Sequence, residues 1–123
     1  MTIIDLFEKV VLEFAEHVAI VDRESYLTYK DINQKASQLA TYLISSGLKA
    51  NEPVGVLAYR DSNYIIAILA ILKAHCYYVP LDPKYPDDRL DFIIENTEMR
   101  FLVGVSEKLN PILVNHEPKK KYI

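Results

Sequence analysis

A neighbouring histidine and cysteine, His75 and Cys76, are the residues of this sequence that come nearest to a nucleophile with its base. A catalytic cysteine needs such a base within hydrogen-bonding distance and an oxyanion site beside it. Adjacent residues on a helix do not face each other, so the spacing does not favour this chemistry. We therefore interpret Cys76 as a small buried hydrophobic residue and His75 as a partner of a helix dipole.

Three carboxylates, Asp82, Asp87 and Asp88, form a second group with chemical potential. Paired carboxylates carry out acid–base catalysis when their pKa values are driven apart. A structural interpretation explains the same residues. It places Asp82 in a turn beside Pro83 and the other two at a helix N-terminus, where the dipole stabilises negative charge. We favour the structural interpretation.

Two charged residues, Arg60 and Asp61, follow an apolar run at residues 54–58 that predicts a buried strand. Ligands of open α/β sheets bind beyond the carboxyl ends of strands, so Arg60 could meet an anion there. An ion pair with a surface carboxylate explains the residue equally well, and we favour that interpretation.

The rest of the sequence gives little support for a metal site, a disulfide or a nucleotide-phosphate site. His17 and His116 lie far apart, and a metal site needs three or four converging ligands. The single cysteine excludes an internal disulfide framework. The three glycines, Gly47, Gly55 and Gly104, are widely separated, whereas a phosphate-binding loop needs clustered glycines. We assign no catalytic, nucleotide-binding or metal-binding residue to this chain.

Length and composition indicate one globular domain. The 123 residues are 50% hydrophobic and 25% charged, with a net charge of −3. This balance gives no reason to expect nucleic acid or an anionic membrane as partner. The longest apolar stretch, residues 64–72, falls far short of the roughly 20 residues that cross a bilayer. Asp5 stands where a signal peptide would be basic, so we expect a cytoplasmic protein.

The first element predicted is a helix over residues 2–17. Thr2 and Asp5 resemble a capping box at its start. Leu6, Val10 and Phe14 recur at four-residue spacing with Phe7 and Val11 beside them, and together they predict an apolar stripe that faces the core.

A β-hairpin over residues 18–28 and a second helix follow. Thr28 with Asp31 forms a second candidate capping box at the start of that helix. Gly47 stands where the glycine that follows a helix belongs.

The pattern then changes to α/β, with β-α-β-α-β from about residue 54 to residue 105. Right-handed crossovers predict a parallel β-sheet with flanking helices, and Pro80 is expected to stop the middle strand. Residues 1–105 thus form an α/β module that begins with helix–hairpin–helix. Residues 106–123 are a poorly defined tail with one candidate strand at residues 112–114 and a solvated lysine run at residues 119–121.

Two stretches resemble core motifs of one enzyme family. Residues 27–32, Leu-Thr-Tyr-Lys-Asp-Ile, resemble the first core motif of adenylation domains, Leu-Thr/Ser-Tyr-x-Glu-Leu. Residues 72–74 and 78–90, which include Tyr-Val-Pro-Leu-Asp-Pro followed by Tyr-Pro and Arg-Leu, resemble the second. The family is the adenylate-forming, AMP-binding ligase superfamily, and the closest likeness is to amino-acid-activating domains of nonribosomal peptide synthetases. The resemblance runs from the first helix to about Val105.

The resemblance implies the opening part of a large N-terminal subdomain. Complete enzymes of this family bind ATP with Mg²⁺, form an acyl-adenylate with release of pyrophosphate, and pass the acyl group to a phosphopantetheine thiol. Their phosphate loop, their selectivity pocket and their catalytic lysine lie beyond the region covered here. We therefore expect this truncated chain to bind no cofactor alone and to be inactive by itself.

The sequence departs from the family pattern at one corner. After residues 72–74 the family prefers glycine followed by glycine or alanine, whereas His75, Cys76 and Tyr77 stand here. A non-glycine residue in the left-handed region costs roughly 1–2 kcal/mol. We expect either another backbone at this corner or the loss of a constraint. Drift after loss of activity and lineage variation are both open explanations.

An interface is predicted from aromatic residues in or beside the α/β region, which are Tyr59, Tyr64, Tyr77, Tyr78 and Tyr85. Its occupant would be the remaining adenylation-domain polypeptide or a second copy of the chain. By the family resemblance, Lys84, Tyr85 and Arg89 are candidates for a surface that docks a small MbtH-like protein.

Three hypotheses follow. The first is a fragment, or one half of a split enzyme, in ATP-dependent amino-acid activation. The second is a free-standing interaction or regulatory module derived from an adenylation domain. The third and least favoured is a small enzyme with unrelated chemistry at Cys76 or the acidic cluster.

Overall fold

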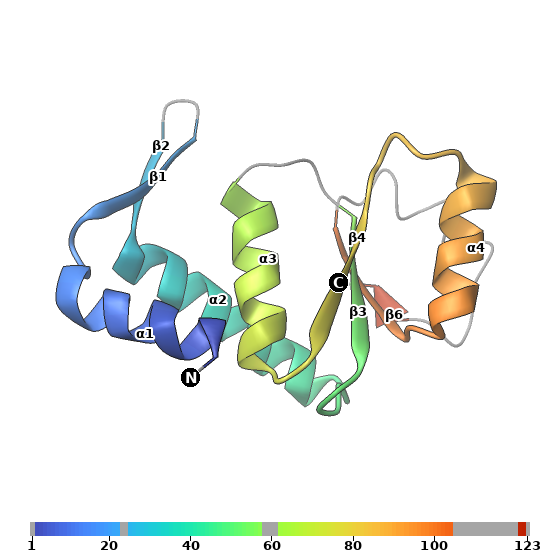
Figure 1. Cartoon of the computed structure of the whole chain (residues 1–123), viewed down its shortest axis with the longest axis horizontal. Coiled ribbons are helices and arrows are strands. Elements are labelled where there is room, and N and C mark those ends of the chain that lie inside the picture. Colours follow the sequence, from blue (N-terminus) through green and yellow to red (C-terminus); the bar gives the residue numbers. More distant parts are fainter. Residues whose placement is uncertain (1, 23–24, 58–61, 105–120, 123) are drawn as a thin grey trace.

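The structure is a computed structural model that describes residues 2–22, 25–57, 62–104 and 121–122 (Figure 1). Helix–hairpin–helix forms the first part, as predicted. The elements are helix α1 (Ile3–Phe14), strands β1 (Val18–Asp22) and β2 (Ser25–Thr28), and helix α2 (Tyr29–Ser45). β1 and β2 pair in antiparallel fashion. None of the helices in the described ranges is long and apolar enough to span a membrane.

Both predicted capping boxes are present. The Thr2 hydroxyl accepts the Asp5 N–H at 3.1 Å, and the Asp5 carboxylate accepts the Thr2 N–H at 3.0 Å. Thr28 and Asp31 repeat this exchange at the same distances at the start of α2. The hydrogen bonds from the threonines lower the pKa of both aspartates, because they stabilise the charged carboxylate.

The end of α2 confirms the place predicted for Gly47. This glycine has a φ of 109°, in the region that favours glycine. Its N–H donates to the Ile44 carbonyl at 3.0 Å, and the Leu48 N–H donates to the Leu43 carbonyl at 3.1 Å. These two bonds are those of a Schellman motif, which caps the last free carbonyls of a helix.

The predicted β-α-β-α-β unit is confirmed. Strands β3, β4 and β5 are parallel, and they lie in the order β4-β3-β5-β6. The elements are β3 (Pro53–Leu57), α3 (Ser62–Lys73), β4 (Tyr77–Leu81), α4 (Asp87–Thr97), β5 (Phe101–Gly104) and β6 (Lys121–Tyr122).

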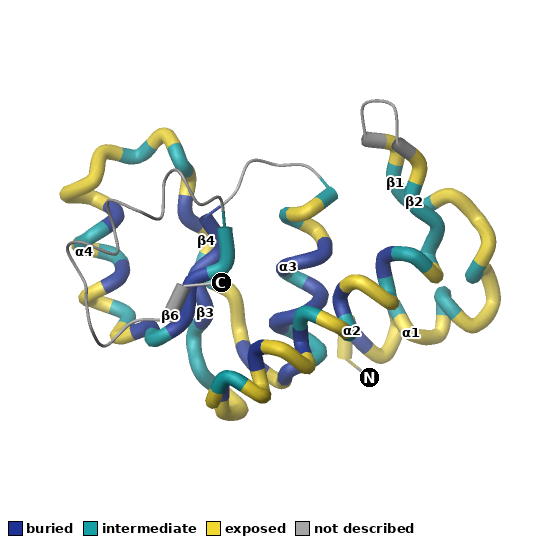
Figure 2. Tube along the Cα trace, turned by 180° about the vertical axis from the view of Figure 1, so that it is seen from behind, coloured by how far each residue is buried: buried dark blue, intermediate teal, exposed yellow. Residues whose placement is uncertain are grey.

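The parallel sheet separates two parts of the core. Val54 and Val56 of β3 belong to a cluster with residues of α2 and α3. Leu57 of β3 and Leu81 of β4 belong to a second cluster with residues of α4. Figure 1 shows α3 and α4 on opposite sides of the strands, so each helix covers a different face of the sheet. Figure 2 shows from behind that buried and exposed segments alternate along both helices.

Helix α1 meets the core with only part of the predicted stripe. Ile4 is buried, and Phe7, a member of that stripe, packs against the cluster shared by α2 and α3. Leu6 and Phe14 are exposed, so the prediction is wrong for these two residues. Apolar residues occupy more than one side of α1, and only the positions of α2 and α3 select the side that is buried.

Two strand predictions also change. β4 continues through Pro80 to Leu81 instead of stopping before the proline. β4 ends the sheet order, and a proline is tolerated in such a strand because its missing N–H can face the open side. Lys121 and Tyr122 form β6, which pairs with β5 at a place where no strand was predicted. The strand predicted at residues 112–114 falls outside the described residues.

Candidate functional site

The residues predicted as a partner surface follow β4 directly. Lys84 is exposed and Tyr85 is half-buried against the cluster under α4. The Arg89 guanidinium carbon lies 4.2 Å from the centre of the Tyr85 ring, which is a cation–π contact. We call Lys84, Tyr85 and Arg89 the β4–α4 surface. The fold brings these three residues together at the carboxyl end of a parallel strand, where α/β proteins bind ligands.

Asp82 occupies the turn that was predicted for it. Its carboxylate accepts the Lys84 N–H at 2.9 Å, and its carbonyl accepts the Tyr85 N–H at 3.0 Å. Asp87 and Asp88 lie in the first turn of α4, as predicted. All three carboxylates therefore support the chain reversal between β4 and α4, where the helix dipole favours negative charge.

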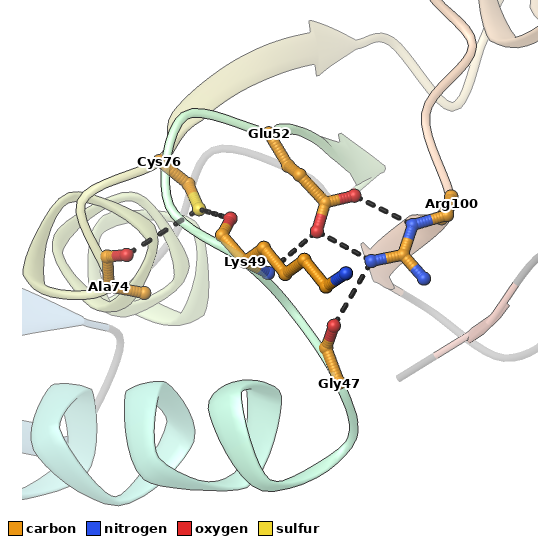
Figure 3. Close-up of polar contacts among 6 residues, drawn as sticks. All are labelled: Gly47, Lys49, Glu52, Ala74, Cys76 and Arg100. Atoms are coloured by element: carbon orange, nitrogen blue, oxygen red, sulfur yellow. Dashed lines mark hydrogen bonds and ion pairs between the residues drawn. The ribbon is translucent and has the colours of Figure 1, made fainter.

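A polar cluster lies at the opposite end of the strands (Figure 3). Arg100, directly before β5, holds Glu52, directly before β3, through two hydrogen bonds of 2.7 and 2.6 Å. The same Arg100 Nη2 donates to the Gly47 carbonyl at 3.0 Å. The Glu52 carboxylate also accepts the Lys49 N–H at 2.6 Å. The cluster thus ties the turn after α2 to the amino ends of two strands.

The pair changes the ionisation of both partners. The side-chain hydrogen bond with Arg100 lowers the pKa of Glu52, against a smaller effect of burial in the other direction. The same bond raises the pKa of Arg100. Sequence reasoning missed this pair. Part of the signal was present, because Glu52 and Arg100 stand near the starts of two strands that were predicted to belong to one parallel sheet, but the order of the strands in that sheet was not predicted.

Cys76 is buried beside this cluster, as predicted. Its thiol donates to the Lys49 carbonyl at 3.0 Å and lies 3.5 Å from the Ala74 carbonyl oxygen (Figure 3). Burial raises the pKa of the thiol, and the protonated thiol is a poor nucleophile. The surroundings of Cys76 therefore favour the interpretation as a packing residue.

His75 keeps the backbone that a glycine would adopt, with a φ of 61°. Its N–H donates to the Leu72 carbonyl at 3.0 Å, and the Cys76 N–H donates to the Ile71 carbonyl at 3.1 Å. These are again the bonds of a Schellman motif. Of the two alternatives expected at this corner, another backbone is therefore wrong, and the loss of a constraint stays a prediction. The His75 carbonyl also accepts the Asn51 N–H at 2.8 Å, which joins the corner to the segment before β3.

The structure describes only one of the remaining charged and histidine candidates, His17. Arg60, Asp61, Tyr59 and His116 lie outside the described residues. His17 packs edge-on against Phe14 at a ring distance of 5.2 Å. Within the described part of the chain, no three histidine, cysteine or carboxylate side chains converge as they would around a metal ion.

Comparisons with known proteins all find similarity to one family of enzymes. A family model described as "AMP-binding enzyme" matches residues 7–123. Gramicidin S synthase 2 of Brevibacillus brevis is 40% identical over 116 residues, which are 94% of this chain and 3% of that protein. Bacitracin synthase 3 of Bacillus licheniformis is 38% identical over 107 residues, which are 87% of this chain and 2% of that protein. The chain thus spans only a small part of the length of these relatives.

Solved structures give the same fold. NpsA of Klebsiella oxytoca in complex with 3-hydroxyanthranilyl-AMSN superimposes with a TM-score of 0.82 at 19% identity, over 98% of this chain and 24% of that one. The N-terminal subdomain of NpsA in complex with 3-hydroxybenzoyl-AMSN gives 0.78 at 22% identity, over 83% and 26%. At this identity the likeness concerns the fold.

Proposed function

The chain belongs to the AMP-binding enzyme family, and from this premise we propose that it serves in ATP-dependent amino-acid activation together with the rest of an adenylation domain, without catalysing the reaction alone. It corresponds to the N-terminal part of an adenylation domain of the nonribosomal peptide synthetase type. The observation that carries the proposal is the extent of the likeness. Most of the chain matches these relatives, yet it matches only 2–3% of their length.

The two motifs have definite places in the fold. The first contains the Thr28–Asp31 capping box that begins α2. The second runs from β4 through the Asp82 turn into α4. Both motifs build the framework of the α/β module, and this supports a role for the chain as the part on which the remainder of the domain is assembled.

The glycines support the absence of independent catalysis. Gly47 ends α2, Gly55 lies in β3 against Leu102, and Gly104 lies in β5 against Leu57. Each glycine has a structural task, and none of them lies in a glycine-rich loop that could wrap a triphosphate. ATP and Mg²⁺ would accordingly be held by the remaining polypeptide, with a phosphopantetheine carrier as acceptor.

The test is amino-acid-dependent exchange between ATP and pyrophosphate. The purified chain should show no exchange above a no-protein control. The chain produced together with the remainder of an adenylation domain should show it. Exchange by the isolated chain that is lost on substitution of one of its residues would overturn the proposal. The reading frame beyond Ile123 provides an independent check, since a phosphate-loop sequence there supports the proposal.

A second function, a free-standing interaction module, is favoured by the β4–α4 surface. The Arg89 guanidinium stacked on Tyr85 and the exposed Lys84 form a basic aromatic surface that suits a protein partner. A small MbtH-like protein is the partner we propose for it, in the cytoplasm. Titration of the chain with such a protein should show binding that Arg89→Ala weakens and that Lys9→Ala, a substitution on exposed α1, leaves unchanged. Equal binding by both variants would exclude this surface.

A further inference from the structure

Strand β4 is exposed to an extent that its place in a parallel sheet does not explain. Strands of parallel sheets are covered on both faces as a rule. β3 follows the rule, since four of its five residues are buried. In β4 only Leu81 is buried, while Tyr77 is 54% and Tyr78 is 39% exposed. β4 therefore lacks cover that its neighbour β3 has.

The uncovered positions lie on both faces of β4. Tyr78 and Pro80 are in register with Val54 and Val56, so they extend the sheet face that α3 covers. Tyr77 is in register with Pro53 and starts the opposite face, which the cluster under α4 covers farther along the strand, at Val79 and Leu81. Each helix thus stops short of part of β4.

Helix α3 adds two apolar side chains to this region. Ala67 and Ile71 belong to the cluster on the sheet, while Ile66 and Ala70 belong to the cluster with α1 and α2. The remaining side of the helix carries Ile65, which is 42% exposed, and Ile68, which is half-buried. Helical spacing turns this side away from α2, and α3 contacts β4 as well as β3. We call Tyr77, Tyr78, Pro80, Ile65 and Ile68 the β4 surface.

The open edge of β4 is better suited to side-chain packing than to hydrogen bonding with a further long strand. The Tyr77 N–H donates inward, to the Glu52 carbonyl at 3.2 Å. Successive residues of a strand present their N–H groups to opposite sides, so Tyr78 points its N–H outward. Pro80, the next outward position, has no N–H to offer, and a proline there discourages a further strand. The apolar side chains must then supply most of the attraction.

The relatives indicate what covers this surface. The chain matches 26% of the NpsA N-terminal subdomain, so most of that single folded unit has no counterpart here. A larger unit with the same fold must place its additional polypeptide against surfaces that this chain leaves open. The β4 surface is apolar and aromatic, which is the composition of the buried core of an interface.

We propose that the β4 surface is the docking site for the remainder of the adenylation-domain N-terminal subdomain. This inference rests on the proposed function, and it names the partner and the surface. Tyr78 is the central contact, because its side chain lies on the sheet face shared with α3 and its own N–H is the outward one of the β4 edge.

The test uses this chain produced in one cell with the remainder of an adenylation domain from gramicidin S synthase 2, including its C-terminal subdomain, which carries the affinity tag. The variants are Tyr77→Lys with Tyr78→Lys, and Tyr78→Phe, which keeps the aromatic ring. Tyr42→Lys is the matched control, since Tyr42 is 58% exposed on α2. Circular dichroism of each variant alone establishes that it is folded.

The expected result is equal recovery of the wild-type chain, Tyr78→Phe and Tyr42→Lys on the tagged partner. The double variant should be recovered roughly tenfold less, the size expected for loss of central aromatic contacts. In the complex, the Tyr78 amide should exchange with deuterium more slowly than in the free chain.

Recovery of the double variant at the wild-type level, unchanged exchange of the Tyr78 amide, or no complex with the wild-type chain would each overturn the inference. A homodimer that the double variant abolishes, without binding of the tagged partner, would assign the surface to a second copy and overturn it too. A complex that needs Tyr78 but shows no ATP–pyrophosphate exchange would contradict the proposed function alone. ATP–pyrophosphate exchange that the double variant leaves unchanged would contradict only the docking site.

Discussion

Arg100 and Glu52, 48 residues apart in sequence, form a two-point ion pair across the amino ends of β5 and β3, with hydrogen bonds of 2.7 and 2.6 Å. The planar guanidinium matches the carboxylate at both oxygens, which is a strong arrangement for such a pair. The third bond of Arg100, to the Gly47 carbonyl, brings the end of α2 into the same arrangement. The pair lies opposite the carboxyl ends of the strands and therefore serves the framework of the domain.

Removal of the guanidinium should destabilise the fold. We expect Arg100→Met to lower the free energy of unfolding by about 1–2 kcal/mol, because Glu52 loses its charged partner while exposure of Arg100 to water limits the loss. Urea denaturation followed by circular dichroism measures the change. Lys30→Met is the control, because its contact with Glu16 is 3.9 Å long and both side chains are exposed. An equal loss in both variants would contradict this role.

The same pair should make stability depend on pH. The folded-state pKa of Glu52 is lowered, so its contribution is complete above the unfolded value near 4.5 and is lost as the pH falls through the folded pKa. We expect the wild-type chain to exceed Glu52→Gln in unfolding free energy at pH 7. The difference should shrink as the pH falls below 4.5. A difference that stays constant from pH 7 to pH 3 would show that the carboxylate charge is not its source.

His75 should be a site where glycine is preferred. With a φ of 61°, its side chain strains a turn that otherwise has the bonds of the Gly47 turn. His75→Gly should raise the free energy of unfolding by about 0.5–1 kcal/mol, the strain relieved minus the added freedom of the unfolded glycine. His75→Ala keeps the Cβ and should leave stability nearly unchanged. Thermal unfolding of the three proteins tests the order, and a less stable glycine variant would show that the imidazole makes a compensating contact.

Cys76 should react slowly in the folded protein. It is the single cysteine of the chain and is buried, and its pKa is raised by burial. A thiol-specific chromogenic disulfide reagent at pH 7 should therefore label native protein at least roughly tenfold more slowly than protein in urea, because only the thiolate reacts. Rapid labelling of the native chain would indicate an accessible thiolate and would revive the nucleophile hypothesis.

Features built by residues a few positions apart were predictable from the sequence. The capping boxes at Thr2 and Thr28 and the helix end at Gly47 depend on contacts within one or two turns. The alternation of apolar strands and helices after residue 54 then indicated a parallel sheet, and the motif at residues 78–90 indicated the family. The Asp82 turn followed from the local pattern, whereas the grouping of Lys84, Tyr85 and Arg89 came from the family resemblance.

Other features needed the tertiary structure. Apolar spacing in α1 allowed more than one buried side, and contact with α2 and α3 selected Ile4 and Phe7. The position of β4 at the end of the sheet let the strand pass through Pro80.

What the sequence by itself determined was therefore the local structure, the order of the elements and the family. The tertiary structure alone decided which distant groups meet, such as Arg100 with Glu52, and which apolar side chains, such as Tyr78, stay uncovered. The physical reason is that short-range hydrogen bonds are specified by neighbours in the chain, whereas burial depends on which elements pack together in space.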